Sequence, residues 1–99
     1  MHCDVGVVGL GVMGANLALN MERNGFRIAG YDLEAAKGQA FVAGPAAGRK
    51  VDLAASPDRL MAMLKRPRRV LMMVPAGAAV DSAIAHLKPH LQPGDILID

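Results

Sequence analysis

Three glycines near the start of the chain are spaced as G-x-G-x-x-G, directly after a short apolar, β-branched run and before a stretch with helical apolar periodicity. Glycine costs backbone entropy inside a regular element, so three at fixed spacing indicate a tight turn that something must approach closely. Gly9 suits the turn, Gly11 lets a phosphate reach N–H groups at the helix start, and Gly14 allows close packing of helix and strand. The motif comprises Gly9, Leu10, Gly11, Val12, Met13 and Gly14. In this context it predicts a dinucleotide-binding loop.

The rest of the chain alternates between strand and helix signals. The pattern predicts strands at 3–8, 26–31, near Val51, 70–74 and 96–98, and helices from the glycines to Asn24-Gly25 and over 33–42, 57–64 and 77–87. Such alternation predicts an α/β fold with an open, doubly wound, Rossmann-like parallel sheet in the order 3-2-1-4-5. The 99 residues are 53% apolar but only 3% aromatic, which suits one dinucleotide-binding domain, residues 1–99, with an aliphatic core.

An acidic residue, Asp32, ends the second predicted strand 18 residues after Gly14. A carboxylate here would accept hydrogen bonds from the ribose hydroxyls of NAD and would repel the 2′-phosphate of NADP. Leu33 and Glu34 follow, so this loop offers no arginine to that phosphate, and Glu34 adds a second negative charge. Lys37 is the nearby cation that opposes this effect. We therefore expect NAD as the cofactor, in preference to NADP.

Charge and apolar patterning argue against several other classes of function. The net charge is only +2, and the basic run at 65–69 lacks interleaved aromatics, so we expect a solvated turn there and no nucleic-acid partner. No apolar run reaches the roughly 18 residues of a membrane span. Cys3 is the single cysteine, and no signal peptide precedes it, so we expect a buried thiol and a cytoplasmic protein. We expect His86 and His90 to be solvated rather than catalytic, and we predict no metal site.

Several stretches of the chain resemble the cofactor domain of the 6-phosphogluconate dehydrogenase family. The opening of that domain is similar to G-L-G-V-M-G-A-N-L-A-L-N-M at 9–21, and later parts are similar to residues 23–26, 65–69, 76–77, 80–81 and 94–99, in the same order. The resemblance covers the whole chain. It implies an NAD(P)-dependent oxidoreductase of the pentose phosphate pathway, which oxidises 6-phosphogluconate at C3 and releases CO2 to give ribulose 5-phosphate.

The resemblance also implies roles for individual residues. Residues 9–14 would hold the pyrophosphate, with Met13 near the nicotinamide, and residues 32–34 would meet the adenosine ribose. The cofactor groove would also be lined by Val74, Pro75 and Ala76. Two departures from the family pattern agree with the preference for NAD: many members have Asn-Arg-Thr at 32–34, and a lysine in the loop after the fourth strand is replaced here by Pro75.

In this family the catalytic lysine and glutamate, and a Gly-Gly-Asn that contacts cofactor and substrate, lie beyond the position of Asp99. We therefore expect no catalytic residue within these 99 residues, which would be inactive alone. We expect them to be the N-terminal part of a longer homo-oligomeric enzyme, with strand 96–98 left partly bare. Two alternatives stay open: a 3-hydroxyisobutyrate-type dehydrogenase of the same superfamily, and a stand-alone NAD-binding module without catalysis.

Overall fold

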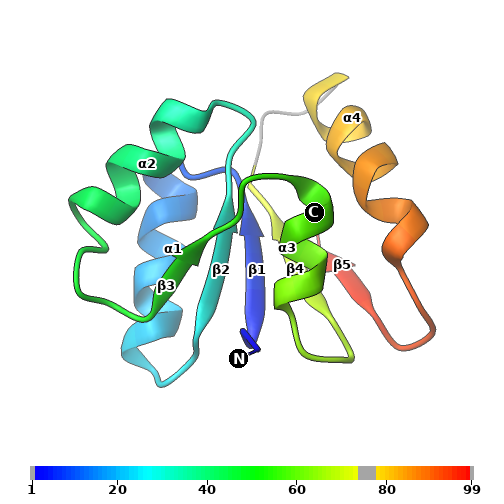
Figure 1. The fold of residues 1–99 in the computed structure, drawn as a ribbon, viewed down its shortest axis with the longest axis horizontal. Coiled ribbons are helices and arrows are strands. Elements are labelled where there is room, and N and C mark those ends of the chain that lie inside the picture. The colour runs from blue at the N-terminus through cyan, green and yellow to red at the C-terminus, as the bar shows by residue number, and fades with distance from the viewer. Residues whose placement is uncertain (1, 74–77, 99) are drawn as a thin grey trace.

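The chain folds into a five-stranded sheet in which each pair of neighbouring strands is parallel. The structure is a computed structural model that describes residues 2–73 and 78–98. Its strand order is β3-β2-β1-β4-β5, which confirms the predicted doubly wound, Rossmann-like α/β fold (Figure 1). The strands are β1 (Val5–Val8), β2 (Ile28–Tyr31), β3 (Val51–Leu53), β4 (Arg69–Met72) and β5 (Ile96–Ile98).

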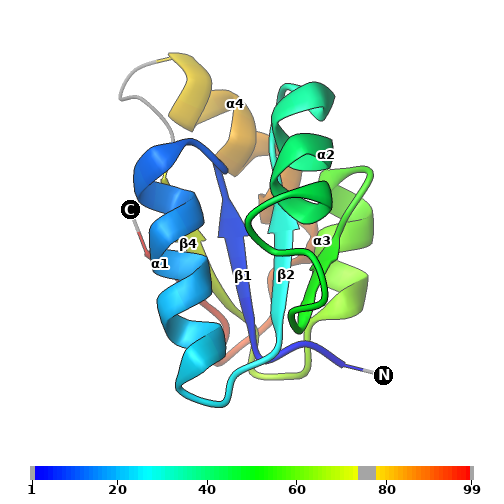
Figure 2. The ribbon, with the colours of Figure 1, turned by 90° about the vertical axis from the view of Figure 1, so that its left-hand side faces the viewer.

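Helices cover both faces of this sheet. The helices are α1 (Val12–Arg23), α2 (Ala35–Ala43), α3 (Pro57–Met63) and α4 (Ala78–Leu87), and a short 3-10 turn, Lys88–His90, follows α4. Side chains of α1 and α2 pack on one face and those of α3 and α4 on the other, and Figure 2 shows α1 and α3 on opposite sides of the strands. Within the part of the chain that the structure describes, none of the helices is both long and apolar enough to cross a bilayer.

Local signals in the sequence account for two of the helix boundaries. Helix α1 ends at Arg23 with Asn24 as its C-cap, and the next residue, Gly25, has a φ of +96°, a left-handed conformation that favours glycine. Helix α3 begins after Ser56, whose hydroxyl accepts a hydrogen bond from the N–H of Arg59 at 3.2 Å. Both ends therefore lie where the predicted stop and start signals place them.

The first two strands start later than the apolar pattern predicts. The N–H of Asp4 donates to the backbone oxygen of Arg27 at 2.7 Å, but the N–H of Arg27 donates to the Asp4 carboxylate at 2.8 Å, so a side chain takes one of the backbone donors at this point. The hydrogen bond to the carboxylate is also the main reason why the pKa of Asp4 is lowered. Cys3 pairs with Leu64 in an isolated parallel bridge outside β1. Regular pairing of β1 with β2 therefore begins only after these residues.

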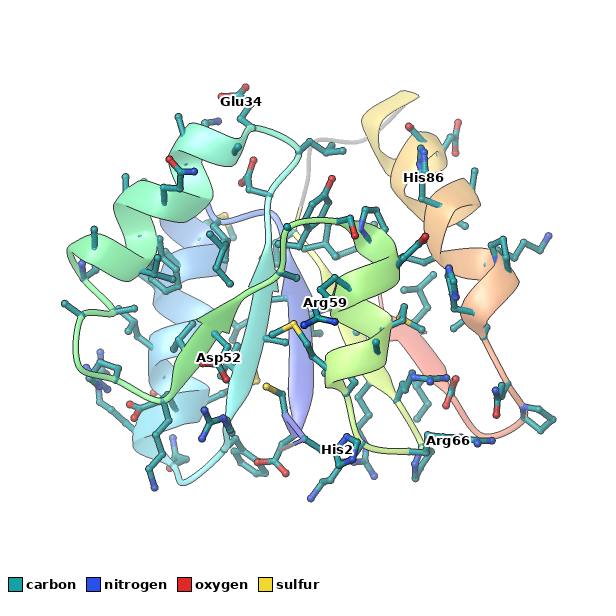
Figure 3. All side chains as sticks on the ribbon, viewed as in Figure 1. His2, Glu34, Asp52, Arg59, Arg66 and His86 are labelled. Carbon is teal, nitrogen blue, oxygen red and sulfur yellow. The ribbon has the colours of Figure 1, made fainter. Side chains whose placement is uncertain are left out.

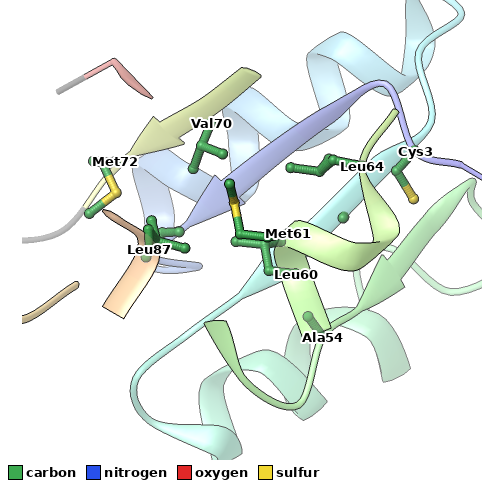
Figure 4. Close-up of a cluster of buried hydrophobic side chains, with 10 residues drawn as sticks. Cys3, Ala54, Leu60, Met61, Leu64, Val70, Met72 and Leu87 are labelled. Atoms are coloured by element: carbon green, nitrogen blue, oxygen red, sulfur yellow. The ribbon is translucent and has the colours of Figure 1, made fainter. Parts of the chain in front are cut away.

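Two clusters of buried apolar side chains fill the layers between the sheet and its helices. The cluster under α3 and α4 is shown in Figure 4 and consists of Cys3, Val8, Ala29, Ala54, Leu60, Met61, Leu64, Val70, Met72 and Leu87. The cluster under α1 and α2 consists of Val7, Leu10, Ala18, Leu19, Ile28, Phe41, Ala46 and Val51. Cys3 is 1% exposed, so the prediction of a buried thiol is confirmed.

Arg68 is the exception in the basic run at 65–69, whose other residues are exposed as the predicted solvated turn requires. Its side chain is only 15% exposed and donates hydrogen bonds to the backbone oxygens of Met61 and His90. It also forms an ion pair, at 3.4 Å, with Asp95, whose side chain is almost completely covered. The pKa of Asp95 is lowered mainly because its carboxylate accepts a hydrogen bond from the backbone N–H of Arg68. One arginine of the run therefore fastens the start of β4 to the turn that precedes β5.

The fifth strand leaves apolar side chains partly uncovered, as predicted. Ile96 and Ile98 are 47% and 46% exposed, whereas Leu97 packs against the cluster under α3 and α4. The register of β5 on β4 pairs Leu97 with Val70. Alternate residues of β5 thus face the core and the open surface.

Candidate functional site

The glycine loop turns the chain from β1 into α1 at the carboxyl end of the sheet. Gly9 follows β1 directly and has a φ of +98°, a conformation that L side chains rarely adopt. Its N–H donates to the backbone oxygen of Tyr31, at the end of β2, at 2.8 Å. The first glycine of the motif therefore makes the tight turn that its position in the sequence predicts.

Gly14 lets the first turn of α1 lie directly against this loop. A Cβ atom built on Gly14 would overlap the carbonyl oxygen of Gly9 and would lie 3.3 Å from the Cβ of Met73. No side chain, not even that of alanine, has room at this position without a shift of the backbone. The predicted role of the third glycine in close packing is thus visible in the structure.

Gly11 is the N-cap of α1 and leaves the start of the helix accessible. No side chain of the described residues caps this end, and the first helical hydrogen bond runs from the N–H of Ala15 to the oxygen of Gly11 at 2.8 Å. The N–H groups at the start of a helix have no partner within the helix, and together with the helix dipole they attract anions. A Cβ built on Gly11 meets no atom of residues 2–73 and 78–98 within 4 Å, so these residues leave open the space beside the N–H groups. The geometry suits a phosphate group.

A cavity of about 660 Å³ lies along this loop at the carboxyl ends of the strands. It is lined by Gly9, Gly11, Val12, Met13, Gly14, Asp32, Leu33, Glu34, Lys37, Met72 and Met73. Because β1 pairs with β2 on one side and with β4 on the other, the chain reverses its winding direction here, and ligands of doubly wound sheets bind at such a point. Figure 3 shows Glu34 at this end of the molecule and Arg66 at the opposite end.

Most of the residues predicted for the site line this cavity, which we call the cofactor groove. Leu10 differs, because its side chain is only 5% exposed and packs into the core against Gly30. The other three predicted residues, Val74, Pro75 and Ala76, lie outside the described residues.

Lys37, Met72 and Met73 line the groove although they were not among the predicted site residues. The two methionines lie at and just after the end of β4, next to β1, a position that the predicted strand order alone could have indicated. Lys37 lies three residues after Glu34 in the first turn of α2, and its ammonium forms an ion pair with the Glu34 carboxylate at 3.7 Å. The nearby cation that opposes the preference for NAD is therefore already paired with an anion.

Asp32 makes hydrogen bonds that its place in the sequence does not reveal. Its Oδ2 accepts from the N–H of Leu10 at 2.7 Å, and its Oδ1 accepts from the N–H of Glu34 at 2.8 Å. A carboxylate offers about four lone-pair positions, so acceptor capacity remains for ligand hydroxyls. Asp32 thus joins the glycine loop to the segment that enters α2.

The rim of the groove is unusually apolar for an exposed surface. Val12 and Met13 are 80% and 73% exposed, and Leu33 is 45% exposed. Clustered apolar side chains of this kind, next to a few well-placed polar groups, are typical of a binding site. The groove therefore offers N–H groups for an anion, a carboxylate for hydroxyls and apolar surface for planar rings.

His86 and His90 lie outside the lining of the cofactor groove. His86 contacts the backbone oxygen of Ser82, and His90 contacts the carboxylate of Asp58, each at 2.8 Å. Among residues 2–73 and 78–98, no group of three or more His, Cys, Asp or Glu side chains is arranged to hold a metal ion. The described lining of the groove offers N–H groups, carboxylates and apolar surface to a ligand.

Comparison with known proteins gives a consistent result. Residues 4–99 match the family model described as the NAD binding domain of 6-phosphogluconate dehydrogenase. The decarboxylating 6-phosphogluconate dehydrogenase of Synechococcus elongatus is 51% identical over 94 residues, which is 95% of this chain and 20% of that protein. The Saccharomyces cerevisiae protein named 6-phosphogluconate dehydrogenase, decarboxylating 2, is 45% identical over 96 residues, again 20% of its length. The chain thus spans about a fifth of the length of these curated relatives.

Solved structures agree with this assignment. The Plasmodium falciparum 6-phosphogluconate dehydrogenase, studied without ligand, with its cofactor NADP+ and with its substrate 6-phosphogluconate, superposes with a TM-score of 0.86 and 36% identity. This match covers 98% of the chain and 21% of that enzyme. A 3-hydroxyisobutyrate dehydrogenase from Mycobacterium tuberculosis superposes with a TM-score of 0.76 but only 22% identity, over 31% of its length, so it shares the fold.

Proposed function

This chain belongs to the family of NAD-binding domains of 6-phosphogluconate dehydrogenase, and from this membership we propose that it binds NAD as the cofactor part of such an enzyme. The observation that carries the proposal is the cofactor groove, where the glycine loop, an uncapped helix start and Asp32 meet at the switch point of the sheet. The complete protein would then oxidise and decarboxylate 6-phosphogluconate. We further propose that it is a cytoplasmic homo-oligomer and that residues 1–99 form its N-terminal domain.

The groups that line the groove indicate which part of the cofactor each residue would bind. Gly11, Val12 and Met13 would offer backbone N–H groups to the pyrophosphate, and Asp32 would accept from the adenosine ribose. Val74, Pro75 and Ala76 remain in the proposed lining on the family resemblance alone. The cofactor, when bound, accepts the hydride. General acid and base groups would come from outside this chain, so we propose that the 99 residues bind cofactor without turnover.

A preference for NAD over NADP is supported by the charges at the ribose end of the groove. Two carboxylates, those of Asp32 and Glu34, and one ammonium, that of Lys37, lie in the segment that would face the 2′ position, and their net negative charge would repel a phosphate there. Lys37 is paired with Glu34, so the charges of these two side chains largely offset each other and the carboxylate of Asp32 supplies the net negative charge. The Plasmodium falciparum relative has been studied with NADP+, so the preference would distinguish this chain from that enzyme.

Fluorescence titration of the chain with NADH and with NADPH tests this proposal. We expect NADH to bind at least about tenfold more tightly, because the 2′-phosphate must approach the net negative charge of Asp32, Glu34 and Lys37. Equal dissociation constants for the two cofactors would contradict the preference for NAD. Binding of neither cofactor would reject the proposed function itself.

The double variant Leu33→Arg with Glu34→Gln is expected to reduce this preference by about tenfold or more. It supplies a guanidinium for the phosphate, removes one repelling charge and frees Lys37, while Asp32 keeps its hydrogen bonds. Phe26→Arg is the matched control, because Phe26 is 46% exposed, similar to Leu33, and does not line the cofactor groove. A double variant with the same ratio of NADH to NADPH affinity as the control would show that these side chains do not determine selectivity.

A further inference from the structure

We propose that Asp32 is also a positioning residue for the pyrophosphate loop, a role that rests on the proposed function and goes beyond contact with ribose. The observation is a bridge between two backbone segments that are far apart in the sequence. One oxygen of Asp32 accepts the N–H of Leu10, 22 residues away, and the other accepts the N–H of Glu34. Binding of a ribose hydroxyl alone would not require a hydrogen bond between Asp32 and the glycine loop.

The bridge acts on the part of the loop that must present N–H groups to a phosphate. Gly9, just before the bridged residue, is held by the backbone oxygen of Tyr31. The Leu10 side chain lies in the core against Gly30, and its N–H is held by Asp32. The loop is thus fixed at two consecutive residues, Gly9 to the last residue of β2 and Leu10 to the residue after it, just before the helix start at Gly11.

Fixing the loop before the ligand arrives strengthens binding, because less conformational freedom is lost when the complex forms. A carboxylate suits this task, since hydrogen bonds to an ionised acceptor are about twice as strong as those between neutral groups. The two N–H donors also compensate part of the negative charge of Asp32 near an anion site. About two of its four lone-pair positions stay available, so the bridge and a ribose contact are compatible.

Hydrogen exchange of the chain without ligand tests the bridge itself. In the variant Asp32→Ala, the Leu10 amide is expected to exchange about tenfold faster or more, while the amide of Val7 in β1 stays protected. Asp58→Ala, which removes an exposed carboxylate outside the groove, is the control. Unchanged exchange at Leu10 would overturn the proposal. If Asp32→Ala does not fold, Asp32→Asn replaces it. The asparagine side chain has one oxygen and can accept only one of the two N–H groups, so hydrogen exchange should still become faster at Leu10 or at Glu34.

Binding of two nucleotides separates the positioning role from the ribose contact. ADP carries the ribose hydroxyls, whereas 2′,3′-dideoxy-ADP does not and therefore cannot lose a direct contact with Asp32. We expect Asp32→Ala to weaken binding of the dideoxy nucleotide by about fivefold or more, and Asp32→Asn to recover part of this loss. If only ADP binding weakens, Asp32 acts through the hydroxyls alone and the proposal fails. If the unmodified chain binds neither nucleotide, the proposed function fails, and hydrogen exchange alone decides the bridge.

Discussion

Replacing Gly14 by alanine is expected to lower the free energy of unfolding by about 3 kcal/mol. The added methyl group would overlap the carbonyl oxygen of Gly9, which belongs to the backbone and cannot rotate away as a side chain can. Gly9 is itself held by Tyr31, and Met73 lies on the other side at 3.3 Å, so α1 must move away from the sheet. Alanine normally favours a helix, and this loss would therefore be opposite in sign to the usual effect of the substitution.

Urea unfolding followed by circular dichroism measures this effect. The midpoint for Gly14→Ala should fall well below that of the unmodified chain, at an unchanged dependence on urea concentration. A change of less than about 1 kcal/mol would mean that the helix and the loop have room to separate. The close approach of α1 to Gly9 would then not be needed for the fold.

The variant Gly11→Ala is expected to keep its stability but to bind NADH about 10- to 100-fold more weakly. The added methyl group meets no atom of the described residues within 4 Å, and the φ of Gly11, −71°, is normal for alanine. It would, however, stand in the groove beside the N–H groups that we propose for the pyrophosphate. Charged hydrogen bonds to those N–H groups would be lengthened or lost.

The two glycine variants serve as controls for each other. Gly11→Ala separates loss of binding from loss of folding, because its urea midpoint should match that of the unmodified chain within about 0.5 kcal/mol. Titration of this folded variant with NADH then measures only the change in affinity at the cofactor groove. Unchanged affinity for NADH would place the pyrophosphate elsewhere on the molecule.

The sequence predicted the architecture well because the relevant signals are local. Alternating strands and helices determine the strand order, and the left-handed turn at Gly9, the stop at Gly25 and the cap at Ser56 each depend on one or two neighbouring residues. The family assignment rests on motifs in the same order along the chain, and it is confirmed. The alternation of strands and helices, the turn and cap residues and the family motifs all indicate the same fold, which explains this agreement.

Features that depend on contacts between distant segments were not predictable in the same way. Arg68 lies in a basic run typical of a solvated turn. Its side chain is hydrogen-bonded to Asp95, 27 residues later, and to the backbone oxygens of Met61 and His90. Asp32 could be predicted at the ribose end of the groove. Its hydrogen bond to the N–H of Leu10 appears only when the ends of two strands are placed side by side.

The measurement that tests the central claim most directly is chemical-shift mapping by nuclear magnetic resonance while NADH is added to the isotope-labelled chain. We expect the largest amide shifts at residues 11–14 and 32–34, around the cofactor groove, and small shifts at the opposite end of the sheet near Arg66. Shifts centred away from residues 11–14, or no shifts at millimolar NADH, would contradict the assignment of this groove as the dinucleotide site.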